Sequence, residues 1–340
     1  YLACLHVMMG SNTTALVPST CASLDTVTTK LAVVYLYFFL FPFALLLNGL
    51  AAWVSLHLRS TSTFIVYLKN LVAADLLLTL MLPPRAASML PKAATWLGLK
   101  AFNCRFSSVI FYTCLYTSIS LMGLISLDRF FKIVRPKLFG NLTFGKVVSC
   151  SVWVIHFGST ALPNIILTNG SVANLTTIST CMVLKGPAGL DFHETVVIYL
   201  NVFFWLVSVV VVVCYICITH KVIQSFRNSG SNNNQGKQKI KLRVFLVVIV
   251  FFVSFGPYHI VRIPYTFQQV AVSSHNSCLY IISRLAKKVS LWFATTNICM
   301  NPLLYVFLCR EFKEKLTSMM QNGPMSFLAV SAEKTLHSST

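Results

Sequence analysis

The sequence is short of charge. Asp, Glu, Lys and Arg make up only 10% of its 340 residues, whereas hydrophobic residues make up 56%. In an ordinary globular domain about a quarter of the residues are charged. A soluble fold would leave much of this apolar surface in water, so the composition excludes one. It favours a chain that lies in lipid, where charged side chains are costly.

The groups that catalysis needs are also missing. The chain has eight Asp and Glu and eight His. No nucleophile stands with a base, and His156 and His259 have no partner histidine at metal-ligand spacing, which excludes an enzyme. A light-driven pump or photoreceptor would need a lysine deep in the last hydrophobic segment, where this chain has Thr295 and Thr296. The absence of an internal repeat disfavours a transporter.

Long uncharged runs mark the membrane crossings, because a bilayer core about 30 Å thick needs roughly 20 helical residues. Six runs lack Asp, Glu, Lys and Arg: 31–58, 106–127, 147–184, 195–220, 244–261 and 289–309. A further stretch, about 64–90, carries Lys69, Asp75 and Arg85 but is otherwise apolar. We therefore predict an all-α membrane protein, a seven-transmembrane helix bundle.

This topology explains most of the net charge of +19, because basic residues gather on the cytoplasmic side of a membrane protein. With the amino terminus outside, 17 of the 27 basic residues fall on the cytoplasmic side, as the positive-inside rule requires. We therefore expect membrane lipids, and no nucleic acid, as partners. The same orientation places three glycosylation sequons outside, at Asn12, Asn169 and Asn174.

Three parts of the chain are expected. Residues 1–30 form an extracellular amino-terminal segment, 31–309 the seven-transmembrane domain, and 310–340 a membrane-surface helix with a short cytoplasmic tail. The helix is indicated by Phe312 and Leu316, four residues apart among charges. Cys309, just before it, is a palmitoylation candidate. The polar run 228–241 predicts an inner loop between the fifth and sixth crossings.

Asp75 is the deepest charge in the predicted bundle. A ring of seven helices brings it near Ser118, Asn297 and Asn301, which all carry oxygen. Such a set suits a small hard cation, and we predict an allosteric sodium ion, with no other cofactor. A hydrogen-bonded polar core that only fixes the packing of the helices is the alternative.

Cations gather at the outer ends of the helices and in the outer loops. They are Lys100, Lys185, Arg262, Lys287 and Lys288, opposed there only by Asp25, Asp191 and Glu194. Arg284 is expected near the outer surface. A concave site with many cations and few acids favours phosphate. Tyr112 and Tyr265 offer flat faces on which a base could stack.

Short motifs in order along the chain resemble those of the rhodopsin-like, class A G-protein-coupled receptors. They are Asn48, 71–75, Asp128-Arg129-Phe130, Trp153, Pro257, Asn301-Pro302-Leu303-Leu304-Tyr305 and Phe312. The resemblance implies that Asp128 restrains Arg129 at rest, and that Tyr215 and Tyr305 reorganise around Arg129 on activation. Movement of the sixth helix then opens a cleft for a G protein; an arrestin and a receptor kinase are further expected partners.

Three longer segments, 104–112, 162–169 and 258–266, are similar to the purinergic nucleotide receptors, within the subgroup that couples to inhibitory G proteins. Residues 297–300 and 307–312 resemble its ADP-responding members. This implies a plasma-membrane receptor for an extracellular nucleotide, ADP, that lowers cAMP. A receptor for a UDP-sugar or a lysophospholipid is the alternative.

The resemblance also assigns roles to single residues. It implies that Tyr112 stacks the base and that Asn164 and His193 bond the base or sugar. The phosphates would be held by Lys185, Arg262, Tyr265, Gln269 and Lys287, with Lys100 nearby. It further implies two outer disulfides, Cys104 with Cys181 and Cys21 with Cys278.

Overall fold

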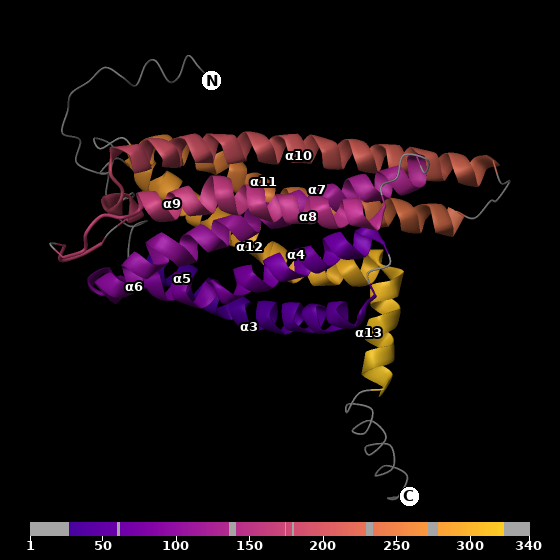
Figure 1. Ribbon diagram of the computed structural model, residues 1–340, viewed down its shortest axis with the longest axis horizontal. Helices are drawn as coiled ribbons and strands as arrows, with labels where there is room; N and C mark the ends of the chain where they lie inside the picture. Colours follow the sequence, from indigo (N-terminus) through magenta and orange to yellow (C-terminus); the bar gives the residue numbers. More distant parts are fainter. Residues whose placement is uncertain are drawn as a thin grey trace, which may run out of the picture.

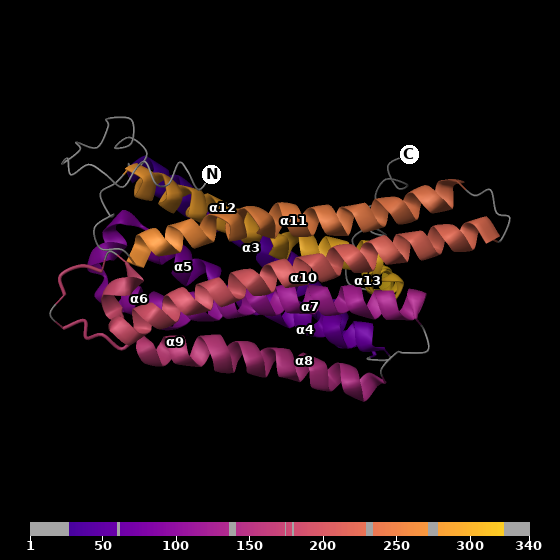
Figure 2. The same ribbon diagram turned by 90° about the horizontal axis from the view of Figure 1, so that it is seen from above.

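The computed structural model describes residues 27–59, 62–135, 141–173, 175–178, 180–228, 234–270 and 278–322. Within these ranges every regular element is helical. The main helices are α3 (Val27–His57), α4 (Thr63–Leu80), α5 (Leu82–Ser88), α6 (Leu97–Phe102), α7 (Ser108–Val134), α8 (Leu142–His156), α9 (Leu162–Leu167), α10 (Pro187–Asn228), α11 (Asn234–Val270), α12 (Cys278–Leu308) and α13 (Arg310–Asn322). The long helices lie roughly parallel, with α7 in the middle of the bundle (Figures 1 and 2).

The bundle has the length and composition of a multi-pass membrane protein. Among the described residues, six helical segments are long and apolar enough to cross a bilayer: Leu31–His57, Thr63–Ser88, Leu97–Val134, Leu142–Leu167, Pro187–Arg227 and Phe245–Gln269. Counting the bent pair of α12 and α13, which meet at 93°, brings the number to seven. The predicted seven-transmembrane helix bundle is confirmed.

One predicted boundary differs from the structure. The uncharged run 147–184 behaves as expected: its crossing ends with α9 at Leu167, and a connection with a 3-10 turn at Cys181–Leu184 follows. The inner loop predicted over 228–241 is shorter, since α11 begins at Asn234. Gln235, Lys237 and Lys239 are good helix formers, so the polar run continues the helix. As a result α10 and α11 extend beyond the other helices at one end (Figure 2).

Prolines and π turns interrupt several helices. Pro257 and Pro264 lie inside α11, and Pro302 lies inside α12. Each proline removes one backbone hydrogen bond and bends its helix. Two π turns, Asn103–Ser107 and Phe157–Ala161, precede α7 and α9. Breaks of this kind are frequent at functional sites.

Side-chain hydrogen bonds tie the helices together. The Asn48 amide on α3 donates to the carbonyl oxygens of Ala44 and Ile298, each at 2.9 Å, and so links α3 to α12. The Trp153 indole on α8 donates to the Asn70 amide oxygen on α4 at 3.0 Å. The bilayer core offers these polar groups no water, so the bonds replace those that water would make.

The short helix α13 turns away from the bundle (Figure 1). Phe312 is buried and its ring lies 5.7 Å from that of Tyr305. Arg310 and Glu314 form a 2.6 Å ion pair on the exposed side. The predicted short helix after the last crossing is confirmed, with one apolar side packed on the bundle and the other carrying charge. Its place at the membrane surface stays a prediction.

The predicted palmitoylation of Cys309 needs an accessible thiol, but Cys309 is buried. It is only 3% exposed, and its sulfur accepts a hydrogen bond from the Phe312 backbone nitrogen at 3.4 Å. The thiol thus satisfies a free amide at the start of α13. Acylation would require the thiol to leave this position, so palmitoylation stays a prediction that the burial disfavours.

We expect Asn48→Ala to lower the melting temperature by about 2–5 °C, because two hydrogen bonds between or within membrane helices are lost, together worth about 1–2 kcal/mol. Cys150→Ala is the matched control, since Cys150 is exposed on α8. The measurement is thermal unfolding of the purified protein in one detergent. Equal melting of the two variants would show that the Asn48 bonds do not stabilise the bundle.

Candidate functional site

A cavity of about 550 Å³ lies at one end of the bundle, which we call the disulfide end because it holds the bond between Cys104 and Cys181. That bond joins the start of the third crossing to the loop between α9 and α10, and it confirms the first predicted disulfide. A cavity of this size can enclose most of a small organic ligand.

All nine predicted ligand-binding residues line this cavity. They are Lys100, Tyr112, Asn164, Lys185, His193, Arg262, Tyr265, Gln269 and Lys287. They come from five separate parts of the fold: α6, α7, α9 with the loop before α10, α10 itself, and the neighbouring ends of α11 and α12. That they contact a ligand stays a prediction. Arg284, expected near the outer surface, lines the cavity as well.

Arg85 is a cavity residue that the sequence analysis missed. Its side chain is only 5% exposed. The guanidinium donates to the hydroxyls of Ser108 and Tyr112, each at 3.3 Å, and lies 4.2 Å from the centre of the Phe111 ring. A lone arginine after two prolines in an apolar stretch was the available signal.

Arg262 lies over the rings of Tyr112 and Tyr258. It is 6% exposed, and its guanidinium carbon lies 4.7 Å from the centre of the Tyr112 ring and 5.2 Å from that of Tyr258. Its Nε and Nη1 atoms have no hydrogen-bond partner. A base that stacks on Tyr112, as predicted, must therefore share the ring face with this guanidinium or displace it.

Lys287 completes a cluster of positive charge. Its ammonium lies beside the Tyr112 hydroxyl and 5.1 Å from the centre of the Tyr265 ring, close enough to interact with Arg85 and Arg262. None of the described residues that line the cavity is Asp or Glu. The electrostatic field inside is therefore positive, and the cavity suits a ligand with several negative charges.

A second group of cavity residues, Asn164, Lys185 and His193, lies nearer the loop between α9 and α10. The Lys185 ammonium donates to the Asn164 amide oxygen at 2.9 Å, and the Asn164 amide donates to the Thr160 carbonyl at 2.9 Å. Burial lowers the pKa of Lys185 to about 8. His193 lies beside Gln269 and is close to the charges of Arg262, Lys185 and Lys287. Asn164 is thus oriented by protein contacts and leaves Lys185 able to meet an anion.

The loop over the cavity is held at two places. Beside the disulfide, Arg105 donates from Nε to the Thr168 carbonyl at 2.9 Å and from Nη2 to the Gly170 carbonyl at 2.8 Å. The Gly170 amide donates to the Leu184 carbonyl at 3.0 Å. A Cβ atom at position 170 would lie 2.9 Å from that same carbonyl oxygen, so glycine permits the close approach.

Other predicted features of this end are only partly described. Asn169 is exposed, as a glycosylation site must be. Asn12, Asn174 and Cys21 lie outside the described residues. Cys278 begins α12 as a disulfide cysteine. The second predicted bridge and the glycans therefore stay predictions.

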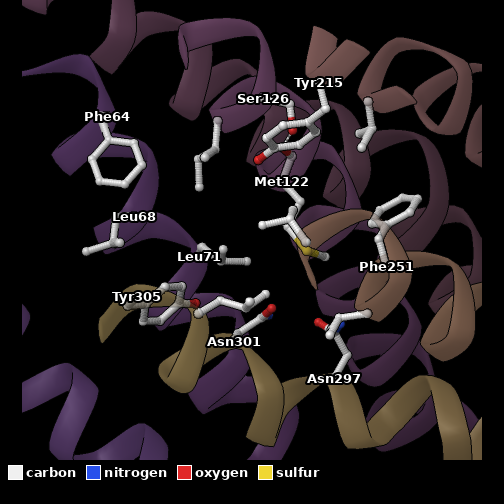
Figure 3. Close-up of a pocket in the computed structure, with 15 residues that line it drawn as sticks. Phe64, Leu68, Leu71, Met122, Ser126, Tyr215, Phe251, Asn297, Asn301 and Tyr305 are labelled. Atoms are coloured by element: carbon white, nitrogen blue, oxygen red, sulfur yellow. Dashed lines mark hydrogen bonds between the residues drawn. The ribbon is translucent and has the colours of Figure 1, made fainter. Parts of the chain in front are cut away.

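The predicted sodium-site residues also come together. Asp75 accepts hydrogen bonds from Ser118 at 2.9 Å, from Asn301 at 2.8 Å and from Tyr305 at 3.2 Å. Asn297, Asn301 and Tyr305 point into a small neighbouring cavity of about 40 Å³ (Figure 3). The carboxylate and the oxygens around it fit a small hard cation, which would compete with these donors for Asp75. In the present arrangement they form a hydrogen-bonded polar core. The sodium ion stays a prediction.

At the opposite end of α7, Asp128 and Arg129 do not pair with each other. Asp128 accepts a hydrogen bond from Thr63 and lies 3.0 Å from the Lys132 ammonium. Arg129 lies over the Phe64 ring, 3.7 Å from its centre. Residues four apart share one face of a helix, whereas adjacent residues do not, so Lys132 is the better-placed partner of Asp128.

Tyr215, the other predicted switch residue, lies on α10 beside Ser126 and lines the same small cavity as Tyr305 (Figure 3). The restraint that the resemblance implies is therefore replaced here by contacts to Thr63, Lys132 and Phe64. The role of these residues in activation stays a prediction.

Comparison with known proteins defines the class. The family model of the 7 transmembrane receptors (rhodopsin family) matches residues 47–305. The chain belongs to this family of receptors, whose members bind a ligand on one side of the membrane and a heterotrimeric G protein on the other, and which are not enzymes.

Individual relatives narrow the class. Purinoceptor 13 of Homo sapiens is 43% identical over 317 residues, covering 92% of this chain and 86% of the relative. Purinoceptor 14 of Bos taurus is 39% identical over 292 residues, 85% of each chain. G-protein coupled receptor 87 of Mus musculus is 40% identical over 290 residues, 83% of this chain and 78% of the relative. Within the rhodopsin family, the chain falls in the purinoceptor group.

We expect binding of an anionic ligand to weaken as the pH rises from 7 to 9, because Lys185, whose pKa is about 8, loses its proton in this range and with it the charge that attracts the anion. One proton lost on one site limits the change to about 10-fold per pH unit above the pKa. Radioligand binding at constant ionic strength measures it. Lys185→Gln should flatten the profile, while Lys92→Gln, at an exposed position in the 3-10 turn Pro91–Thr95, should keep it. If affinity falls equally with pH in the unaltered protein and both variants, Lys185 does not contact the ligand.

Proposed function

We propose that this chain is a plasma-membrane receptor for an extracellular nucleotide, ADP, which lowers cAMP through an inhibitory G protein. The observation that carries the proposal is the positive cavity. Arg85, Arg262 and Lys287 meet at Tyr112 with no acid among the described lining residues. A nucleoside diphosphate has the matching parts, since its phosphates can take charge-assisted bonds from arginine and its base can stack on a tyrosine.

The orientation is supported by independent features. The disulfide end carries Asn169 in a sequon, and disulfides form in oxidising compartments. Most of the basic residues fall towards the other end. The cavity would then open to the extracellular side, and the end with Asp128 and Arg129 would meet the G protein, an arrestin and a receptor kinase.

Two of the relatives described above carry the name purinoceptor, which supports a purine nucleotide for this chain too. A UDP-sugar shares the diphosphate and would use the same cations. A lysophospholipid shares one phosphate but would need an apolar path for its acyl chain. The assay therefore compares ADP with a UDP-sugar and with a lysophospholipid.

The test is a cAMP assay in cells that express the chain at a verified surface level. ADP, UDP-glucose and lysophosphatidylserine are applied in parallel, with and without pertussis toxin. ADP should lower cAMP and the toxin should abolish the response. A response to UDP-glucose or the lipid without one to ADP would overturn the ligand and leave the receptor class intact.

We expect Arg262→Ala to raise the agonist concentration needed for half-maximal response by about 10- to 150-fold, since a charge-assisted hydrogen bond contributes roughly 1.5–3 kcal/mol. Lys92→Ala is the control, because it removes one positive charge from an exposed position of the 3-10 turn Pro91–Thr95 at the same end. The comparison is made at matched surface expression. If both variants shift potency equally, Arg262 acts only through the general field and not through contact with phosphate.

A further inference from the structure

The cluster of Arg85, Arg262 and Lys287 around Tyr112 has a problem of its own, whatever the agonist is. Two guanidinium groups lie 5.2 Å and 4.7 Å from the centre of one tyrosine ring, and an ammonium lies beside the hydroxyl of that same ring. Like charges gathered around one ring repel each other, and the repulsion grows where protein replaces water.

No Asp or Glu among the described cavity residues neutralises this charge. The hydrogen-bond partners of Arg85 are the hydroxyls of Ser108 and Tyr112. The Nε atom of Arg85 and the Nε and Nη1 atoms of Arg262 are buried without any hydrogen-bond partner. Neither side chain is more than 6% exposed. A buried charge with unused donors normally has a counter-ion, because leaving it unpaired is costly.

An agonist with phosphate groups would supply that counter-ion only while it is bound. In its absence the site faces a solution of about 0.15 M ionic strength, in which chloride is the abundant small anion. A spherical monovalent ion needs no particular orientation, and it accepts hydrogen bonds from guanidinium and ammonium donors alike. The cavity around the cluster, about 550 Å³, is large enough to admit it.

We propose that the agonist-free protein binds a small inorganic anion, chloride, at the cluster of Arg85, Arg262 and Lys287. The ion stabilises the empty site by separating the cations. An anionic agonist must displace it, so chloride acts as a competitor, and apparent agonist affinity depends on the anion composition of the medium and not only on its ionic strength.

The test needs no agonist and therefore stands apart from the identity of the nucleotide. The purified full chain is melted while sodium chloride replaces sodium gluconate at constant total sodium and ionic strength. We expect the melting temperature to rise by about 2–4 °C and to saturate, with half of the rise at a chloride concentration on the order of 10 mM. Saturation distinguishes binding from general effects of salt, which continue to grow with concentration.

Variants locate the ion. Arg85→Gln and Arg262→Gln should each lose most of the chloride-dependent rise, whereas Lys92→Gln should keep it. Arg85→Lys retains one charge and should keep part of it. If a variant does not fold, the titration of the unaltered protein still decides: absence of a saturable rise in chloride overturns the proposal. An equal rise in Arg262→Gln and Lys92→Gln would overturn it too, by placing the ion elsewhere.

Discussion

Polar groups in the middle of this bundle have no water to bond with, and the packing of the helices depends on how each of them is satisfied. In a bilayer the backbone is satisfied within each helix, so the side chains decide which helices meet. Asn48 joins α3 to α12, Trp153 joins α8 to Asn70 on α4, and Asp75 joins α4 to α7 and α12. Apolar contacts fill the space between these bonds, but lipid offers such contacts equally well.

The cavity at the disulfide end holds buried charges that are not fully bonded. Arg85 and Arg262 are buried, and each keeps nitrogen atoms without hydrogen-bond partners. Elsewhere in the described bundle the buried carboxylates have donors: Asp75 accepts three hydrogen bonds, and Asp128 has Thr63 and Lys132. Two buried cations with unused hydrogen-bond donors therefore line one cavity, which is what recognition of an anion requires.

The two ends of α7 show how one helix can connect two sites. Tyr112, near its start, lies in the cluster of cations, and Ser118, near its middle, bonds to Asp75. Asp128, near its other end, pairs across to Thr63 on α4. Asp75 also contacts Asn301 on α12, next to the proline where that helix lacks one backbone bond. These shared contacts connect the cluster physically to the far end of the bundle.

The membrane class and the number of crossings could be predicted from the sequence, because runs of about 20 uncharged residues have few other uses. The nine cavity residues could be predicted from positive charge at one end together with the resemblance to the purinergic nucleotide receptors. Helix lengths were less predictable: α10 and α11 run beyond the uncharged stretches, since lysine and glutamine favour a helix as well as a loop.

Only the tertiary structure decided which side chains meet. Arg85 is a lone charge in the sequence, and its place beside Tyr112 depends on how α5 packs against α7. The expected pairing of Asp128 with Arg129 gave way to Lys132 and Phe64 for the same kind of reason. The sequence by itself determined where the chain crosses lipid, since that depends on the polarity of consecutive residues. The partners of each buried charge depend on distances between helices far apart in the chain, which local pattern does not contain.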